Sequence, residues 1–492
     1  MSRPDLLLAI DQGTSSTRAL VFDVAGAVVA VRQRPLSQHY PREGWVEHDA
    51  EEIWSAAVSV CRDAISDVDA GRIAAVGITN QRETCLLWDR RDGKPLHRAI
   101  VWQDRRGADA CRALEENGHA GLIRRTTGLV VDSYFSATKL AWLLDNVPGA
   151  RERATAGDLA FGTIDTFLLW RLTGGRLHAT DATNASRTML FDIHAQRWSP
   201  ELCDLFQVPP AVLPEVRDCV DDFGTTLRDA LGLALPICGV AGDQHAALVG
   251  QGCIAPGAAK ATYGTGCFLL TNEGAAPPTN EGALLTTVAY RLSGKTTFAT
   301  EGAVFNAGTA IAWLRDNLGI IADSPESEAL AAGLDDNGGV YFVPAFTGLG
   351  APYWEPAARG LLTGLGRDTT RAHLARAALE ASAYQTRDLL SAAARPAEVL
   401  RIDGGMAANT WFAQFLADIL DLPVARPVVT ETTARGAALL AGIGAGLYGS
   451  LKEGAATWRA DRTFAPAMAA RRRQALLDGW QQAIRQVRAA CA

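Results

Sequence analysis

The chain is short of lysine, has no CxxC pair, and carries no excess of positive charge. Only five of its 47 basic residues are lysines, and 54 acidic residues give a formal net charge of −7. A protein that binds nucleic acid or an anionic membrane over a broad surface needs a basic face. We therefore expect no nucleic-acid partner, and any anion that binds must be held by a local site.

The cysteines and the apolar runs exclude further classes of protein. Nine cysteines, an odd number without CxxC spacing, lie mostly in apolar runs and indicate buried, reduced thiols rather than disulfides or a zinc site. The start, MSRPDLLLAID, has too few consecutive apolar residues for a signal-peptide core, and the uncharged stretch 436–451 is broken by five glycines. The sequence thus predicts a cytoplasmic protein that does not insert into a membrane.

The length and the strand pattern predict two lobes. A chain of 492 residues with 48% hydrophobic composition exceeds the ~250 to 300 residues at which single cores stop growing. In the first half, short apolar runs with strand character occur at 6–10, 18–23, 27–34, 73–79 and 84–88. Helical patterns follow around 103–117 and 137–146. A mixed sheet flanked by helices is expected here.

The same order of elements returns in the second half. Residues 258–272 again show a strand, a turn of glycine and threonine, and a strand, and further strands are expected near 284–290 and 296–300. The run 399–405 is a strand that enters a turn and the helix 407–420, and a helix over 432–447 closes this unit. We interpret this as a repeat of architecture, with one lobe over residues 1–250 and a second over 251–492.

The segment Asp11–Thr17, DQGTSST, is more polar than a turn between two strands requires. Its consecutive backbone N–H groups, its flexible Gly13 and its four hydroxyl residues suit an anion-binding concavity. A carboxylate cannot contact phosphate directly, but Mg²⁺ and its waters bridge the two. The segment is either a phosphate-binding turn with Asp11 near Mg²⁺ or a polar hairpin with capping hydroxyls.

Three later turns extend this pattern. The second-lobe turn Tyr263–Gly266 corresponds to the first turn, Gly404 and Gly405 allow a close approach of a ring or ribose, and Asp243 follows a strand. Each turn alone has a purely structural explanation, but the ordered set favours a phosphate site in a cleft. The run 289–296, AYRLSGKT, nearly matches the P-loop pattern, yet it lacks the first glycine and the following helix, so a hairpin turn at Ser293-Gly294 is favoured.

Two longer segments, YFSATKLAWL (134–143) and GLLTGLGRDTTRAHLARAALE (360–380), resemble the signature segments of the FGGY carbohydrate kinases. Within that family the chain is similar to members that phosphorylate glycerol. Between about Leu6 and Gly446 the resemblance rests on DQGTSSTR, GWVEHD, ITNQRET, AIVWQ, TNASRTMLF, AGDQ, TYGTGCF, EGAVF, VPAFTGLGAPYW and DGGMAAN. It implies an α/β fold of two actin- and hexokinase-like (ribonuclease H-like) lobes, with mixed sheets around a central cleft.

The resemblance also implies an activity. It is ATP-dependent phosphorylation of glycerol to sn-glycerol 3-phosphate in glycerol uptake and catabolism, by direct in-line transfer, with ATP and Mg²⁺ as cofactors. The first lobe would carry most of the glycerol site, the first phosphate turn and the acid that positions the metal ion. The second would carry the second phosphate turn, the adenosine site and the terminal helix. A homo-oligomer, dimer or tetramer, is implied as well.

The resemblance further assigns roles to residues. Asp243 would be the general base, and Asp11 and Asp243 would position Mg²⁺ through water. The substrate would be contacted by Arg82, Glu83, Trp102, Tyr134, Asp243, Gln244 and Phe268. The nucleotide would be contacted by Thr14, Ser15, Ser16, Arg18, Thr265, Gly308, Gly405 and Asn409. Without the family, Arg82 and Glu83 would be interpreted as a surface ion pair in a loop.

Some interpretations stay open. The rival activities are an FGGY kinase for another polyol or a ketopentose, and a silent nucleotide-binding regulator, which the presence of both Asp11 and Asp243 disfavours. Ala312 and His245 depart from the family pattern near the nucleotide and after Gln244. The cluster His39, Glu47, His48 and Asp49 has irregular spacing for a metal site, so a structural loop is favoured. The tail 471–492 predicts an amphipathic helix docked on the second lobe.

Overall fold

The structure, a computed structural model, describes residues 4–278 and 283–491. The first three residues of the predicted first lobe and the last residue of the predicted tail helix lie outside this part of the chain. The chain divides into two compact units. Unit 1 comprises Met1–Ile254, Thr286–Phe298 and Thr432–Trp458, and unit 2 comprises Ala255–Leu285, Ala299–Glu431 and Arg459–Ala492. Two segments beyond the predicted boundary at residue 250 therefore pack with unit 1.

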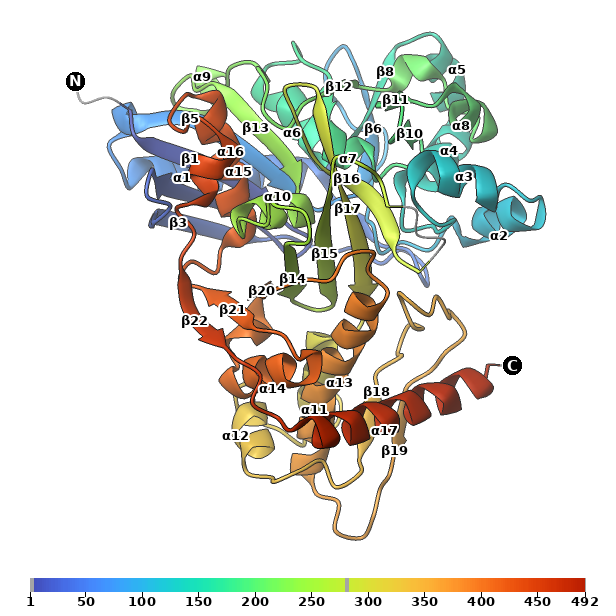
Figure 1. The fold of residues 1–492 in the computed structure, drawn as a ribbon. Coiled ribbons are helices and arrows are strands. Elements are labelled where there is room, and N and C mark those ends of the chain that lie inside the picture. Colours follow the sequence, from blue (N-terminus) through green and yellow to red (C-terminus); the bar gives the residue numbers. More distant parts are fainter. Residues whose placement is uncertain (1–3, 279–282, 492) are drawn as a thin grey trace. The chain divides into compact units, whose positions relative to one another are not determined.

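Unit 1 is built on a five-stranded sheet with the order β13-β5-β1-β2-β3 (Figure 1). Its strands are β1 (Leu6–Gln12), β2 (Ser16–Asp23), β3 (Val28–Pro35), β5 (Ile73–Asn80) and β13 (Ile237–Gly242). β1, β2 and β3 form an antiparallel meander, whereas β1, β5 and β13 run parallel. The carboxyl ends of these three parallel strands therefore meet at one edge.

Helices cover both faces of this sheet. The aliphatic residues of α1 (Ala50–Ser66) and α6 (Ile164–Leu172) share a core with one face. On β5 and β13, α15 (Thr432–Gly444) packs so closely that a Cβ at Gly77 would lie 2.2 Å from the carbonyl oxygen of Ala437. α10 (Asp243–Gly250) packs against α15 through backbone contacts that only glycine permits: a Cβ at Gly436 would lie 1.8 Å from the carbonyl oxygen of Ala246.

A smaller sheet in unit 1 has the order β4-β7-β6-β8. Its strands are β4 (Glu47–His48), β7 (Ala99–Ile100), β6 (Cys85–Asp89) and β8 (Leu159–Thr163). The remaining elements of unit 1 are η1 (Ala70–Arg72), α2 (Ala108–Glu116), α3 (Ala120–Thr127), α4 (Ser136–Asn146), α5 (Ala150–Thr155), β9 (Ala179–Asp181), α7 (Ala182–Ala185), β10 (Phe191–Asp192), β11 (Arg197–Trp198), α8 (Pro200–Leu205), η2 (Pro210–Val212), β12 (Glu215–Arg217), α9 (Arg228–Leu231) and α16 (Leu451–Ala455).

The cluster around His48 is structural, as favoured from the sequence. Asp49 caps α1 by accepting hydrogen bonds from the backbone N–H groups of Glu51 and Glu52. Glu47 is buried and pairs with Arg106 at 2.7 Å. Burial lowers the pKa of His48 to about 4. Within the described ranges, no group of three or more His, Cys, Asp or Glu residues could hold a metal ion.

The second sheet has the order β16-β17-β15-β14-β20-β21-β22. Its strands are β14 (Ala259–Tyr263), β15 (Cys267–Gly274), β16 (Leu285–Leu292), β17 (Lys295–Val304), β20 (Leu400–Asp403), β21 (Val424–Pro427) and β22 (Ala460–Phe464). β14 is antiparallel to β15 and parallel to β20, and β20 is parallel to β21. β14, β15, β20 and β21 thus have the same relative directions as β1, β2, β5 and β13 of the first sheet, which confirms the predicted repeat of architecture.

Helices of unit 2 share one core with this sheet. They are α11 (Gly308–Asp316), α12 (Glu326–Ala332), α13 (Arg371–Ser391), α14 (Thr410–Leu420) and α17 (Ala470–Ala489). The short elements are β18 (Tyr341–Val343), β19 (Leu361–Thr363) and η3 (Gly405–Ala408). α17 lies beside β18 and β19 (Figure 1). Its buried face includes Leu476, Trp480, Ile484 and Val487, so the predicted docking of the tail on the second lobe is confirmed.

Most predicted elements are confirmed, with differences at their ends. The helix expected at 103–117 begins only at Ala108, after a turn. The helix expected at 407–420 is two elements, since Asn409 ends η3 and caps α14. The P-loop-like run is the hairpin β16–β17, in which Ser293 and Gly294 have φ values of 49° and 72°. No helix of the described residues is both long and apolar enough to cross a membrane.

Asp388 of α13 anchors α17. Its carboxylate accepts hydrogen bonds from Trp480 Nε1 at 2.7 Å, Gln481 Nε2 at 3.0 Å and the Tyr353 hydroxyl at 2.8 Å. Burial raises the pKa of Asp388 to about 6, although these donors oppose the rise. The ionised carboxylate is therefore less favourable in the folded chain than in the unfolded one, where the pKa of an aspartate is about 3.9.

The pH dependence of stability tests this assignment. The contribution of Asp388 is fully present below about pH 3.9 and is lost as the pH rises through about 6. The unfolding temperature of the wild type minus that of Asp388→Asn should therefore fall between pH 4 and pH 7. Thermal unfolding followed by circular dichroism measures it, and a difference that grows over this interval would contradict the assignment.

Candidate functional site in unit 1 and glycine turns in unit 2

The three parallel strands of unit 1 bring predicted site residues to one edge of the sheet. Asp11 lies near the end of β1, opposite Thr79 of β5. Gly242, the last residue of β13, lies opposite Asn80 of β5. Arg82 and Glu83 therefore follow β5 at the same edge at which Asp243 begins α10. Carboxyl ends of parallel strands are where ligands bind in open α/β sheets.

Arg82 and Asp243 form an ion pair at this edge. Arg82 Nε lies 3.0 Å from Asp243 Oδ1, and the two side chains are 2% and 28% exposed. The backbone N–H of Gln244 donates to the same oxygen at 2.6 Å. A Cβ on Gly242 would lie 2.7 Å from Arg82 Cγ, so a glycine is required where the arginine crosses β13. The carboxylate of Asp243 thus has a fixed position and keeps access to solvent.

Glu83 is buried and has an unusual backbone. Its φ is 63°, and the N–H of Thr84 donates to the carbonyl of Arg82 at 2.7 Å, which closes a γ-turn around Glu83. Its carboxylate pairs with Arg187 Nε at 2.7 Å, and both side chains are at most 1% exposed. The alternative of a surface ion pair between Arg82 and Glu83 is therefore wrong, because both are buried and each pairs with another residue.

Two aromatic side chains lie beside these charges. Trp102 Nε1 donates to the Thr14 hydroxyl at 2.9 Å, which links it to the first predicted phosphate turn. The rings of Trp102 and Tyr134 meet edge to face at 5.6 Å, and the Tyr134 hydroxyl lies 3.5 Å from Arg82 Nη2. The structure thus brings the predicted substrate residues of unit 1 together.

The first turn stands partly in solvent. Asp11 Oδ2 accepts a hydrogen bond from Arg18 Nη2 at 2.8 Å, and the Asp11 side chain is 6% exposed. The N–H of Gly13 donates to the carbonyl of Ser16 at 2.9 Å, which closes the turn. Ser15 is exposed, whereas Thr14, Ser16 and Arg18 are half-buried. The turn therefore offers hydroxyl groups to solvent while its acid lies beneath them.

The predicted nucleotide residues of unit 2 lie on adjoining glycine turns. The N–H of Gly308 donates to the carbonyl of Gly264 at 3.1 Å, and Thr309 Oγ1 donates to the carbonyl of Thr265 at 2.9 Å. A Cβ on Gly308 would lie 2.5 Å from the Gly264 oxygen, and one on Gly404 would lie 2.4 Å from the Tyr263 oxygen. The start of α11 and the turn after β20 therefore approach the end of β14 this closely only because positions 308 and 404 lack a side chain.

The remaining unit 2 residues have separate surroundings. A Cβ on Gly405 would meet nothing within 4 Å, so a surface is open to a ligand there. Asn409 Oδ1 accepts from the N–H of Phe412 at 2.8 Å and caps α14. Phe268 lies on β15 opposite Thr262 and is half-buried. Ala312 is half-buried on α11.

Several residues of the unit 1 site were not predicted from the sequence. Arg187 holds Glu83, as described above. Lys139 is fully buried on α4, and its ammonium donates to the carbonyls of Ser133, Tyr134 and Phe135 at 2.8, 2.5 and 2.9 Å. Burial lowers the pKa of Lys139. A lysine within the apolar run SATKLAWL was the available signal, because an unpaired charge is seldom buried.

A buried polar layer lies behind the turn at Arg82. The side-chain amides of Asn80 and Asn184 exchange two hydrogen bonds of 3.0 Å, and Asn184 Nδ2 donates to Asp181 at 2.8 Å. The Thr183 hydroxyl accepts from the N–H of Gly242 at 2.9 Å. Burial, with the neighbouring Asp181 adding to it, raises the pKa of Asp165 to about 7. This layer fixes the ends of β5 and β13 relative to each other.

His245 also belongs to this interior. Its Nε2 lies 3.2 Å from the hydroxyl of Thr287, which is 3.0 Å from the hydroxyl of Ser186. The residue that departs from the family pattern after Gln244 is therefore part of a buried hydrogen-bonded row.

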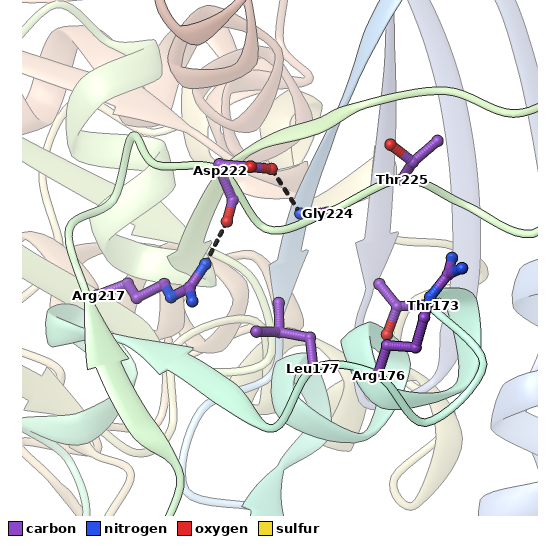
Figure 2. A pocket seen from close by; sticks show the side chains of 7 residues that line it. All are labelled: Thr173, Arg176, Leu177, Arg217, Asp222, Gly224 and Thr225. Atoms are coloured by element: carbon purple, nitrogen blue, oxygen red, sulfur yellow. Dashed lines mark hydrogen bonds between the residues drawn. The ribbon is translucent and has the colours of Figure 1, made fainter.

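A hollow of about 380 Å³ lies elsewhere in unit 1 (Figure 2). Arg217 donates to the main-chain carbonyl of Asp222, and the N–H of Gly224 donates to Asp222 Oδ1 at 2.8 Å. The lining residues are Thr173, Arg176, Leu177, Arg217, Asp222, Gly224 and Thr225. None of the predicted site residues lines it.

The unit 1 site combines a carboxylate, buried hydrogen-bond donors and aromatic side chains at the carboxyl ends of parallel strands, where ligands bind in open α/β sheets. Residues 6–250 match the N-terminal domain of the FGGY family of carbohydrate kinases, and residues 259–445 match its C-terminal domain. The chain belongs to this family.

Individual members of the family and solved structures are similar to this chain over nearly its whole length. The chain is 60% identical over 494 aligned residues to a protein of Rhodospirillum centenum named glycerol kinase, which covers 99% of both chains. A crystal structure of Plasmodium falciparum glycerol kinase with ADP superposes with a TM-score of 0.92, at 35% identity and 98% coverage of both chains. A gluconate kinase of Lactobacillus acidophilus has a TM-score of 0.89 at 23% identity, with 99% and 98% coverage, which shows the shared fold alone.

The three hydrogen bonds of the Lys139 ammonium predict that replacing this lysine lowers the free energy of unfolding substantially. Lys139→Met leaves three carbonyls without their donor, and we expect a loss of about 2 to 4 kcal/mol of unfolding free energy. Urea denaturation measures it, with Lys452→Met, an exposed position on α16, as the control. A change for Lys139→Met no larger than that of the control would refute the assigned role.

Proposed function

We propose that this chain transfers the terminal phosphoryl group of ATP to a terminal hydroxyl of glycerol, giving sn-glycerol 3-phosphate. The observation that carries the proposal is the meeting of Arg82, Glu83, Tyr134 and Asp243 at one sheet edge. The similarity to proteins named glycerol kinase, at 60% identity over nearly the whole chain, supports the choice of acceptor.

The acceptor is recognised through its hydroxyl groups. Arg82 donates hydrogen bonds, Glu83 accepts them, and Tyr134 and Gln244 do either, so neighbouring hydroxyls of a triol find complementary partners. Trp102 and Phe268 contact the carbon chain. A site built from buried hydrogen-bonding groups discriminates strongly against analogues that lack a hydroxyl, because the protein groups are then left unpaired.

Asp243 is the general base in this proposal. Its carboxylate accepts the proton of the attacking hydroxyl, and Arg82 Nε, 3.0 Å from Asp243 Oδ1, holds that carboxylate in place. Its 28% exposure leaves room for an acceptor to approach. Phosphoryl transfer depends mostly on alignment and on charge stabilisation, so a rigid position of this carboxylate is useful.

Turns in each unit carry the residues that we assign to the nucleotide. Thr14, Ser15, Ser16 and Arg18 of unit 1 provide hydroxyl, N–H and guanidinium donors for phosphate oxygens. Thr265 and Gly308 do so in unit 2, and the open surface at Gly405, next to Asn409, receives the adenosine. A similar protein has been crystallised with ADP, which supports the presence of a nucleotide site.

The acids present fit a magnesium ion that arrives with the nucleotide. Mg²⁺ typically keeps several waters and binds through one or two carboxylates plus substrate phosphates. Asp11 and Asp243 are two of the carboxylates at the sheet edge, and the described residues offer no cluster of three or more ligands that would form a separate metal cage. When bound, Mg²⁺ neutralises charge on the phosphate oxygens.

We further propose a cytoplasmic location and a homo-oligomer.

A panel of acceptors tests the activity. ADP release by the purified protein with Mg-ATP is measured with glycerol, dihydroxyacetone, xylulose, gluconate or no acceptor. Glycerol should give the largest stimulation, with sn-glycerol 3-phosphate as product. Faster turnover of a ketopentose or another polyol would replace the proposed acceptor, and no stimulation by any acceptor would favour a nucleotide-binding regulator.

Asp243→Asn tests the base. An amide cannot accept the proton, and the loss of general-base catalysis should lower kcat by ~10²- to 10⁴-fold while ATP binding, measured by calorimetry, remains. Asp63→Asn on α1, where the carboxylate is 49% exposed, is the control and should keep wild-type turnover. Normal kcat in Asp243→Asn would remove Asp243 as the base.

A further inference from the structure

The backbone at Glu83 is held in a conformation that a glutamate rarely adopts. A φ of 63° with an i to i+2 hydrogen bond defines the uncommon, strained form of the γ-turn. A residue other than glycine persists in such a region only where its surroundings over-determine it, and such residues cluster at functional sites. The contacts that hold Glu83 therefore indicate which of its groups, the backbone or the carboxylate, the protein keeps in place.

Two fixed contacts hold Glu83 apart from the turn itself. The hydroxyl of Ser136, at the start of α4, donates to the carbonyl oxygen of Glu83 at 3.0 Å. Arg187 Nε, which follows α7, donates to Glu83 Oε1 at 2.7 Å. One contact fixes the backbone and the other fixes the carboxylate, and they come from different elements of unit 1.

Arg187 is itself fully buried and packed against aromatic rings. Its side chain is 0% exposed, and its guanidinium carbon lies 5.2 Å from the centre of the Phe135 ring and 5.7 Å from that of Tyr134. Both rings sit on the segment whose carbonyls Lys139 binds. The arginine thus contacts both the carboxylate of Glu83 and the ring of Tyr134, two groups assigned to the acceptor.

A buried ion pair is a weak source of stability, because desolvation of both charges offsets their attraction. The Arg187–Glu83 pair therefore has a better explanation in orientation than in folding energy. An arginine holds a carboxylate in a defined plane, which a lysine does not. With Glu83 held in this way, an acceptor hydroxyl meets a carboxylate oxygen at a fixed place.

We propose that Arg187 is a positioning residue that determines acceptor specificity: it orients the Glu83 carboxylate toward the acceptor hydroxyls and the ring of Tyr134 beside it. This inference rests on the proposed function, since it concerns the same acceptor site. Arg187 acts through Glu83 and Tyr134, two residues that we assign to the acceptor.

The test compares Arg187→Lys and Arg187→Met with the wild type. We expect KM for glycerol to rise by ~10-fold or more in Arg187→Lys and by ~10²-fold in Arg187→Met, by analogy with sites that lose one oriented polar contact. KM for ATP should stay within twofold of wild type. The kcat/KM preference for glycerol over propane-1,2-diol, which lacks one hydroxyl, should fall in both variants.

A binding readout accompanies the kinetics. Glycerol should raise the unfolding temperature of the wild type, and this rise should shrink in Arg187→Lys and disappear in Arg187→Met at the same glycerol concentration. Ser136→Ala, which releases only the carbonyl of Glu83, should raise KM for glycerol less than either arginine variant. It also keeps the inference testable if Arg187→Met does not fold.

Arg376→Met is the matched control. Arg376 pairs with Glu380 on α13 of unit 2 at 2.7 Å, and the two side chains are 4% and 0% exposed. Arg376→Met should lower the unfolding temperature without changing KM for glycerol or the kcat/KM preference for glycerol over propane-1,2-diol. If the Arg187 variants behave like Arg376→Met, with lower stability and unchanged KM, the pair is only structural and the inference is wrong.

The outcome for the wild type separates the two proposals. If the wild type phosphorylates another acceptor instead of glycerol, the proposed function fails, and the Arg187 variants are then compared on that acceptor. A raised KM for it with unchanged KM for ATP supports the positioning role. An unchanged KM overturns that role whichever acceptor the protein uses.

Discussion

The parallel pairing of β13, β5 and β1 is the constraint on which the unit 1 site depends. Because the three strands run in the same direction, their carboxyl ends present Asp243, Arg82 with Glu83, and Asp11 at one edge. α15 can cover β5 at such short range only because Gly77 has no side chain. Asp11 and Asp243, which are more than 200 positions apart in the chain, are thereby brought to the same edge by the pairing of β1, β5 and β13.

Beneath that edge the protein gives each of its buried basic side chains an ion-pair partner or hydrogen-bond acceptors. Arg187 has Glu83, Arg82 has Asp243, and Lys139 has three carbonyls. Burying a charge is costly unless it is paired or hydrogen-bonded, so these contacts hold the charged groups in defined positions. The rigidity that phosphoryl transfer requires is therefore present in the unit before any ligand binds.

The sequence indicated the strands, the repeat and the turns, because each depends on local patterns of apolar residues, glycine and hydroxyl groups. The sequence did not predict the left-handed backbone of Glu83 or the burial of its carboxylate. A glutamate disfavours this conformation locally, and the residues that hold it, Ser136 and Arg187, lie on distant elements. The same limit applies to Arg82, which looked like a surface residue. The division of the chain was also hidden, because the return of 432–458 to unit 1 depends on helix packing.

The scarcity of lysine has a practical meaning once burial is known. Of the five lysines, Lys139 and Lys260 are buried, whereas Lys94, Lys295 and Lys452 are exposed and lie outside the candidate site. Reagents that couple to primary amines can therefore attach dyes or a solid support to lysine at three known places. Such attachment leaves the acceptor residues untouched, which suits the protein to immobilised assays.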